Sequence, residues 1–255
     1  MKINWKLFII LLLMSIFGII AVFPYTLTIQ GSLLQNLNVN LYALLTGQII
    51  QGTVMFAIAI FAGLYFAKKV GFGLPILEGW LEGKPVKDYL ISILPISIGL
   101  GLIAGVLIIG LDYLFSFAGV TINVVQSSIN PPAWQGFLAS FYGGINEEIL
   151  LRLFLMTLIV WIFSIIKKTE AGKPTKIGAW LAIVLAAVIF GIGHLPTVMA
   201  ITTLTPLVII RTIVLNAVGG IIFGWLYWKK GLESAMIAHF SADIVLHVLP
   251  FITLM

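Results

Sequence analysis

Seven long apolar segments dominate this chain and restrict what it can fold into. A helix that crosses the hydrocarbon core of a bilayer needs about 20 mostly apolar residues. The chain has seven such segments, at residues 6–26, 41–67, 88–116, 135–166, 177–195, 204–228 and 232–252. Charged residues make up 9% of the 255 positions, compared with about 25% in soluble domains. We therefore predict an all-α, polytopic membrane helix bundle with about seven transmembrane helices, eight being the alternative count.

The positive charges alternate from one connection to the next. Of the 14 lysines and arginines, only Arg152 and Arg211 lie within the apolar segments, apart from Lys6 at the first residue of one. The others precede the first segment or lie between the second and third, fourth and fifth, and sixth and seventh, whereas residues 27–40, 117–134 and 196–203 contain none. Because cytoplasmic loops are enriched in Lys and Arg, we predict a multi-pass protein of the cell membrane with a cytoplasmic N-terminus. The lysines and arginines, which give the chain a net charge of +5, are expected to contact lipid headgroups. No nucleic acid partner is expected.

Several ionisable residues lie inside these apolar segments. Insertion of such a group costs about 2.5–3.5 kcal/mol or more, so these residues are expected to have a shared purpose. They come from three segments that are far apart in the sequence: Glu147, Glu148 and Arg152; His194; and His239 with Asp243. The pattern indicates either a catalytic site or an ion path between helices.

Helical spacing separates the two glutamates. Residues four apart share a helix face, so Glu148 and Arg152 can form an ion pair within the membrane. Glu147 points about 100° away and has no polar residue three or four positions from it. The neighbouring Gly143 and Gly144 could loosen the helix or admit another backbone. We therefore predict that Glu148 is structurally paired and that Glu147 is free to react.

The histidines add groups for acid–base chemistry. Asp243 lies four residues from both His239 and His247, and a carboxylate on one imidazole nitrogen leaves the other nitrogen for catalysis or for a metal. His247, near the outer end, is interpreted as a satisfied structural residue. Phe190 shares a face with His194 and is expected to pack beside the site. The chain has no cysteine and neither an H-E-x-x-H nor a G-x-S-x-G motif, so hydrolysis by activated water is favoured.

Three motifs in this order resemble a known family. E-E-x-x-x-R at 147–152, F-x-x-x-H at 190–194 and H-x-x-x-D at 239–243 are similar to those of the CPBP intramembrane proteases. This family includes the type II CAAX prenyl endopeptidases and the Abi bacteriocin-processing and immunity proteins. The resemblance covers roughly residues 135–250. We predict one transmembrane domain over residues 1–255, with its catalytic core motifs in 135–250.

The resemblance implies an endopeptidase that acts on a membrane-associated peptide or lipidated protein. Glu147 would activate water with the help of His194, His239 and the residue at 243 would stabilise the oxyanion, and Glu148 and Arg152 would support the site. A divalent metal such as zinc is an open question; Glu147, His194, His239 and Asp243 would hold it. The prenyl endopeptidases have Asn at the last position. Asp243 accepts hydrogen bonds but donates none when ionised, which suits orienting His239 or binding metal better than holding an oxyanion.

Two other functions fit the same residues. The Glu, His and Asp side chains could relay protons in a proton- or ion-coupled transporter, although no inverted repeat is visible. The chain could also be a non-catalytic immunity or partner protein that keeps the motifs.

The depth of these residues in the membrane is a further constraint. Glu147 lies about 30 Å along its helix from Lys167, whereas His239 lies only about 14 Å from Lys230. These side chains can meet only if the last segment starts deep, or if others tilt or project beyond the membrane surface.

Overall fold

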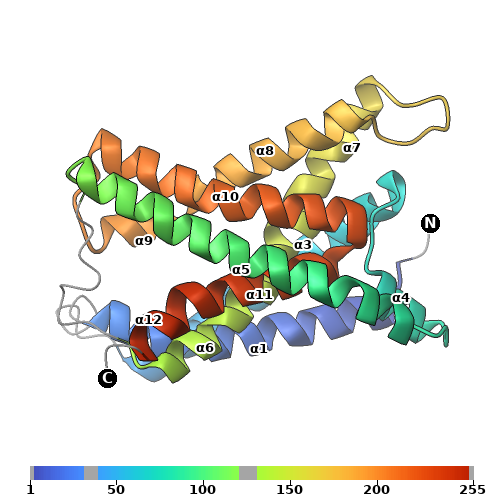
Figure 1. Ribbon diagram of the computed structural model, residues 1–255. Helices are drawn as coiled ribbons and strands as arrows, with labels where there is room; N and C mark the ends of the chain where they lie inside the picture. Colours follow the sequence, from blue (N-terminus) through green and yellow to red (C-terminus); the bar gives the residue numbers. More distant parts are fainter. Residues whose placement is uncertain (1–2, 32–39, 121–130, 253–255) are drawn as a thin grey trace.

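The computed structural model describes residues 3–31, 40–120 and 131–252, which form a bundle of helices (Figure 1). This confirms the predicted all-α polytopic fold. The elements are, in chain order, α1 (Trp5–Ile29), α3 (Leu41–Val70), α4 (Pro75–Leu81), α5 (Lys87–Phe117), α6 (Ala133–Phe141), η1 (Tyr142–Glu147), η2 (Ile149–Met156), α7 (Thr157–Ile166), α8 (Lys176–Gly193), α9 (Leu195–Met199), α10 (Pro206–Lys230), α11 (Leu232–Asp243), η3 (Ile244–Val248) and α12 (Leu249–Ile252).

Six helices in the described part of the chain are long and apolar enough to cross a membrane. They correspond to the first six expected segments, with α6, η1, η2 and α7 forming one continuous helix and α8 continuing into α9. The seventh expected segment, residues 232–252, is helical throughout as α11, η3 and α12, but it is not among these six candidate spans. The orientation with a cytoplasmic N-terminus stays a prediction.

The fourth helix contains two π-helical stretches, η1 and η2, on either side of Glu148. A π-helical turn is wider than an α-helical turn and is frequent at functional sites. The stretch η1 contains the adjacent Gly143 and Gly144, which the sequence analysis expected to loosen the helix. This part of the chain therefore presents its side chains in directions that regular α-helical spacing does not give.

Small residues bring the central helices close together. A side chain at Gly220 of α10 would come within 2.6 Å of the Ala187 Cβ of α8, and one at Gly101 of α5 would come within 2.8 Å of the Ser241 Cβ of α11. Such contacts are typical of membrane helices that pack through glycine. Gly101 and Gly220 each begin a G-x-x-x-G pair, and both lie at a contact between helices.

The start of α11 lies beneath the connection between α3 and α5. The Leu232 amide donates to the Gly73 carbonyl, and the buried Glu233 carboxylate accepts from the Ile76 and Leu77 amides at 3.0 and 2.9 Å. In Figure 1 the α7–α8 connection projects beyond the end of α10, and the helix that contains α6 and α7 crosses the bundle obliquely. The sequence placed Glu147 and His239 at different distances from the ends of their helices. They can still meet because the start of α11 is covered by the α3–α5 connection and because the α7–α8 connection extends beyond the end of α10.

Candidate active site

Glu147, at the end of η1, lies between two imidazoles from other helices. Its Oε1 is 4.0 Å from Nε2 of His194, which follows α8, and its Oε2 is 3.6 Å from Nε2 of His239 in α11. Asp243, one turn after His239, places Oδ1 3.7 Å from the same Nε2. The structure thus brings together all four side chains that the sequence singled out for catalysis, with Glu147 beside both imidazoles and His239 beside both carboxylates.

Gly143 and Gly144 explain why α11 can approach η1 so closely. A Cβ at Gly143 would overlap the Asp243 carboxylate and would lie 3.1 Å from Nε2 of His239. A Cβ at Gly144 would lie 3.0 Å from the Met236 carbonyl oxygen. Because glycine has no Cβ, there is space against η1 for the Asp243 carboxylate. The sequence analysis anticipated a close backbone approach here, but not that a site carboxylate would occupy the space.

Glu148 and Arg152 form the predicted ion pair, and both side chains are almost fully buried. Arg152 Nη1 is 2.9 Å from Glu148 Oε1, and the guanidinium lies over the rings of Phe190 and Phe223 at 5.1 and 5.5 Å. Each of these buried charges is stabilised by the other, because either charge alone would strongly destabilise the fold. The aromatic faces add a favourable cation–π contact to the same guanidinium.

The same glutamate also orients His239. Glu148 Oε1 accepts a hydrogen bond of 2.7 Å from His239 Nδ1, and the Phe223 ring stacks on the imidazole at 4.6 Å between ring centres. The sequence analysis gave this orienting role to Asp243, whose nearest oxygen is too far from His239 for a hydrogen bond. The buried ion pair is therefore continuous with the site, and Nε2 of His239 is directed toward Glu147.

His194 is held in one tautomer by the backbone. Its Nδ1 lies 2.9 Å from the Phe190 carbonyl oxygen, which can only accept, so Nδ1 carries the proton. In the neutral imidazole, the lone pair on Nε2 therefore faces Glu147. Phe190 packs edge-on against both His194 and His239, at 4.6 and 5.9 Å between ring centres, as expected for a residue that packs beside the site.

Exposure distinguishes the reacting groups from their supports. The side chains of Glu147 and His194 are 23% and 34% exposed, whereas Glu148 is fully buried and Arg152 is 2% exposed. His239 and Asp243 lie between these groups, at 7% and 10%. A substrate or a water molecule can therefore reach Glu147 and His194, while the ion pair behind them remains shielded.

The comparison with protein families found a match over the part of the chain that contains these residues. Residues 129–245 match the family model of the Rce1-like type II CAAX prenyl endopeptidases. The match confirms the resemblance seen in the motifs, and it contains all three of them. It supports CAAX-type intramembrane protease activity and a membrane-associated protein substrate. Searches of curated proteins and of solved structures gave no match.

The metal that the sequence analysis left open is still an open question. Glu147, His194, His239 and Asp243 are the residues that a divalent ion such as zinc would use. Among the described residues, however, no three His, Cys, Asp or Glu side chains are arranged to hold a metal ion. The chemistry proposed below is written for the side chains, and metal content is a separate measurement.

Two further polar residues extend the site toward the end of the bundle that contains α12. His247 Nε2 lies 4.0 Å from Asp243, and its Nδ1 lies 3.3 Å from the hydroxyl of Tyr25 in α1. His247 was interpreted as structural, and its contacts with Tyr25 fit that interpretation. Tyr25 and Phe223 were missed by sequence reasoning, because neither has a charged residue or a histidine three or four positions away that would single it out.

Proposed function

We propose that the chain is an intramembrane endopeptidase that cleaves a membrane-associated protein or peptide near its end, using water activated by Glu147. The observation that carries the proposal is a partly accessible carboxylate between the Nε2 atoms of two imidazoles. General bases of this kind act on a group within hydrogen-bonding reach, directly or through one water. The family match supports the same reaction class.

Glu147 and His194 together would position the attacking water. The 4.0 Å between Glu147 Oε1 and His194 Nε2 is too long for a hydrogen bond, but one water can donate to both acceptors. Glu147 takes a proton from this water as the oxygen bonds to the scissile carbonyl carbon. His194 holds the second hydrogen and fixes the direction of attack.

His239 would stabilise the oxyanion that forms. Its Nδ1 already donates to Glu148, so a proton on Nε2 gives an imidazolium that can donate to the carbonyl oxygen. Three carboxylates near the ring, those of Glu147, Glu148 and Asp243, stabilise this positive charge. When the tetrahedral intermediate collapses, the C–N bond breaks and Glu147 returns its proton to the leaving amine. The products are a carboxylic acid and an amine.

Cleavage by purified protein tests this mechanism. The protein in nanodiscs is incubated in ¹⁸O-labelled water with peptides that end in a farnesylated CAAX sequence, and with the same peptides lacking the prenyl group. Mass spectrometry should show one ¹⁸O in the new carboxyl group and loss of cleavage in Glu147→Gln. Glu170→Gln, a glutamate in the exposed α7–α8 connection, is the matched control and should retain activity.

The outcomes also separate the protease from the transporter. Cleavage that persists in Glu147→Gln would contradict the proposed base. Absence of cleavage with every peptide, combined with proton flux across proteoliposomes that depends on Glu147, would favour the transporter.

A further inference from the structure

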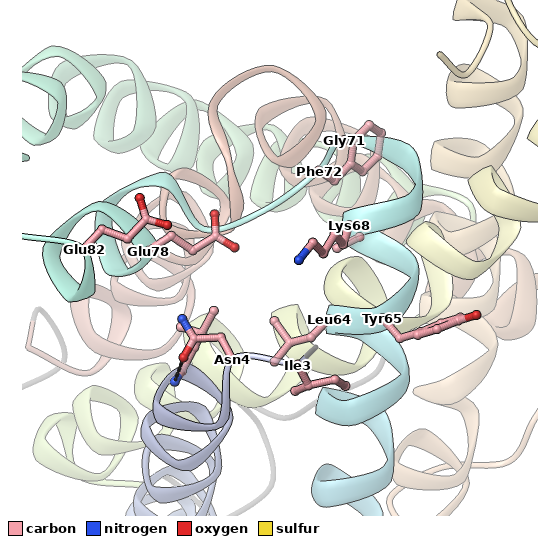
Figure 2. Close-up of a pocket in the computed structure, with 11 residues that line it drawn as sticks. Ile3, Asn4, Leu64, Tyr65, Lys68, Gly71, Phe72, Glu78 and Glu82 are labelled. Atoms are coloured by element: carbon pink, nitrogen blue, oxygen red, sulfur yellow. Dashed lines mark hydrogen bonds between the residues drawn. The ribbon is translucent and has the colours of Figure 1, made fainter. Parts of the chain in front are cut away.

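A polar cavity lies away from Glu147, where the beginning of α1 meets the end of α3 and α4. It has a volume of about 450 Å³, within the range of about 300–1,000 Å³ that is typical of ligand pockets. Figure 2 shows its walls: Asn4 and Ile3 on one side, Leu64 and Lys68 on α3, Phe72 in the linker, and Glu78 and Glu82 on α4. None of these residues has a part in the proposed hydrolysis.

Opposite charges face each other across this cavity without meeting. In Figure 2 the Lys68 amine and the Glu78 carboxylate point toward the same space from opposite walls. Among the described residues Lys68 forms no ion pair, whereas Glu82 is paired with Lys84. Burial raises the pKa of the Glu78 carboxyl, and the charge of Lys68 acts in the opposite direction. The cavity therefore offers one cationic contact and one anionic contact, separated by enough room for a ligand.

The wall that contains Glu78 is fixed in place. The helix α4 is short, but the buried Glu233 accepts hydrogen bonds from two amides of its first turn, those of Ile76 and Leu77. The Glu78 carboxylate also lies over Gly73, where a Cβ would come within 2.8 Å of it. The backbone that carries Glu78 is therefore held in position before any ligand arrives, which lowers the entropic cost of binding.

The surroundings of the cavity resemble the interfacial layer of a membrane. Trp5 and Trp80, on α1 and α4, are 59% and 60% exposed, and tryptophan is enriched at the level of lipid headgroups. Lys69 lies over the Tyr65 ring, and Figure 2 shows that this ring points away from the cavity. Leu7, Leu64 and Phe72 give the cavity apolar walls. A lipid headgroup is thus the natural occupant.

We propose that this cavity binds the headgroup of a phospholipid with both a phosphate and a primary ammonium, as in phosphatidylethanolamine. The phosphate contacts Lys68 and the ammonium contacts Glu78. A purely anionic headgroup would bring its charge against Glu78 and Glu82. A choline headgroup has no N–H to donate to a carboxylate. The zwitterion with a primary ammonium is the headgroup that satisfies both walls.

Lipid retention measured by native mass spectrometry tests the assignment. Protein is taken from nanodiscs that contain equal amounts of phosphatidylethanolamine, phosphatidylcholine and phosphatidylglycerol. The wild type should retain phosphatidylethanolamine preferentially. Lys68→Gln and Glu78→Gln should each lower that preference about two- to fivefold, as expected for charge contacts near a surface. Lys68→Glu, which makes both walls anionic, should abolish it.

Matched controls exclude a general charge effect. Lys69→Gln removes the adjacent lysine, which contacts Tyr65 and does not line the cavity, and should leave the preference unchanged. Lys68 is exposed and unpaired among the described residues, so its variants should keep the wild-type melting temperature. Equal retention of the three lipids, or equal losses in the Lys68 and Lys69 variants, would overturn the proposal. Displacement of the bound lipid by soluble glycerophosphoethanolamine at equal concentration would show that the site recognises a free phosphate ester rather than a membrane lipid.

Discussion

Substitution of Gly143 by Ala tests the site without removing any functional group. Gly143 is buried against α11, and an added Cβ would overlap the Asp243 carboxylate and lie 3.1 Å from His239 Nε2. Ordinary contacts between such atoms are about 3.5–4.0 Å. Asp243, His239 or the whole of α11 must therefore move by roughly 1 Å to admit one methyl group.

The expected effects on activity and stability differ in size. Misplacement of a catalytic group by about 1 Å can lower the rate about 100-fold, so kcat should fall by that order. Stability should change much less. Overpacking costs about 1–3 kcal/mol, and the replacement of Gly by Ala within a helix returns up to about 1 kcal/mol. The free energy of unfolding should therefore fall by no more than about 2 kcal/mol.

The assay compares kcat, KM and melting temperature for three variants on one peptide substrate. Gly99→Ala in α5 is the control, because no atom lies within 4 Å of its added Cβ, and it should have wild-type kcat. Gly144→Ala pushes on the backbone of α11 near Met236 rather than on Asp243, so its kcat should fall less. Wild-type kcat in Gly143→Ala would refute the argument, and so would equal losses in Gly143→Ala and Gly144→Ala.

Five other substitutions probe the support of the site. Arg152→Ala should lower the free energy of unfolding by about 3–5 kcal/mol in chemical denaturation, because it strands the buried Glu148; a loss below about 1 kcal/mol would contradict a buried pair. Glu148→Gln should lower kcat about 10–100-fold by weakening the bond to the imidazole, whereas Asp243→Asn should lower it less than tenfold; the reverse order, with metal content measured on the same samples, would restore the orienting role to Asp243. Gly18→Ala should destabilise the protein by about 1–3 kcal/mol because its Cβ would overlap the Asn146 side chain, and Asn146→Ala in the same chain should remove most of that loss; additive losses in this double-mutant cycle would show that the two sites are independent.

The sequence alone determined the class of protein and one local interaction. Apolar segments of sufficient length must become helices in a membrane, because every backbone polar group there has to be satisfied within its own segment. Residues four apart share a helix face, so the ion pair between Glu148 and Arg152 could be predicted from their spacing. In the structure, the carboxylate oxygen and the guanidinium nitrogen of this pair are 2.9 Å apart. The motifs also selected the four side chains that meet at Glu147.

Only the tertiary structure decided how those side chains divide the work. Periodicity shows which residues share a face, but it contains no information on which helices are neighbours or how deep each one starts. The hydrogen bond between His239 and Glu148 joins residues 91 positions apart. Asn146, the residue before Glu147, donates to the Ser15 carbonyl 131 positions away. The seating of Asp243 on Gly143 likewise depends on how closely α11 approaches η1. Such contacts are set by the packing of surfaces from distant segments, and no local pattern in either segment specifies its partner.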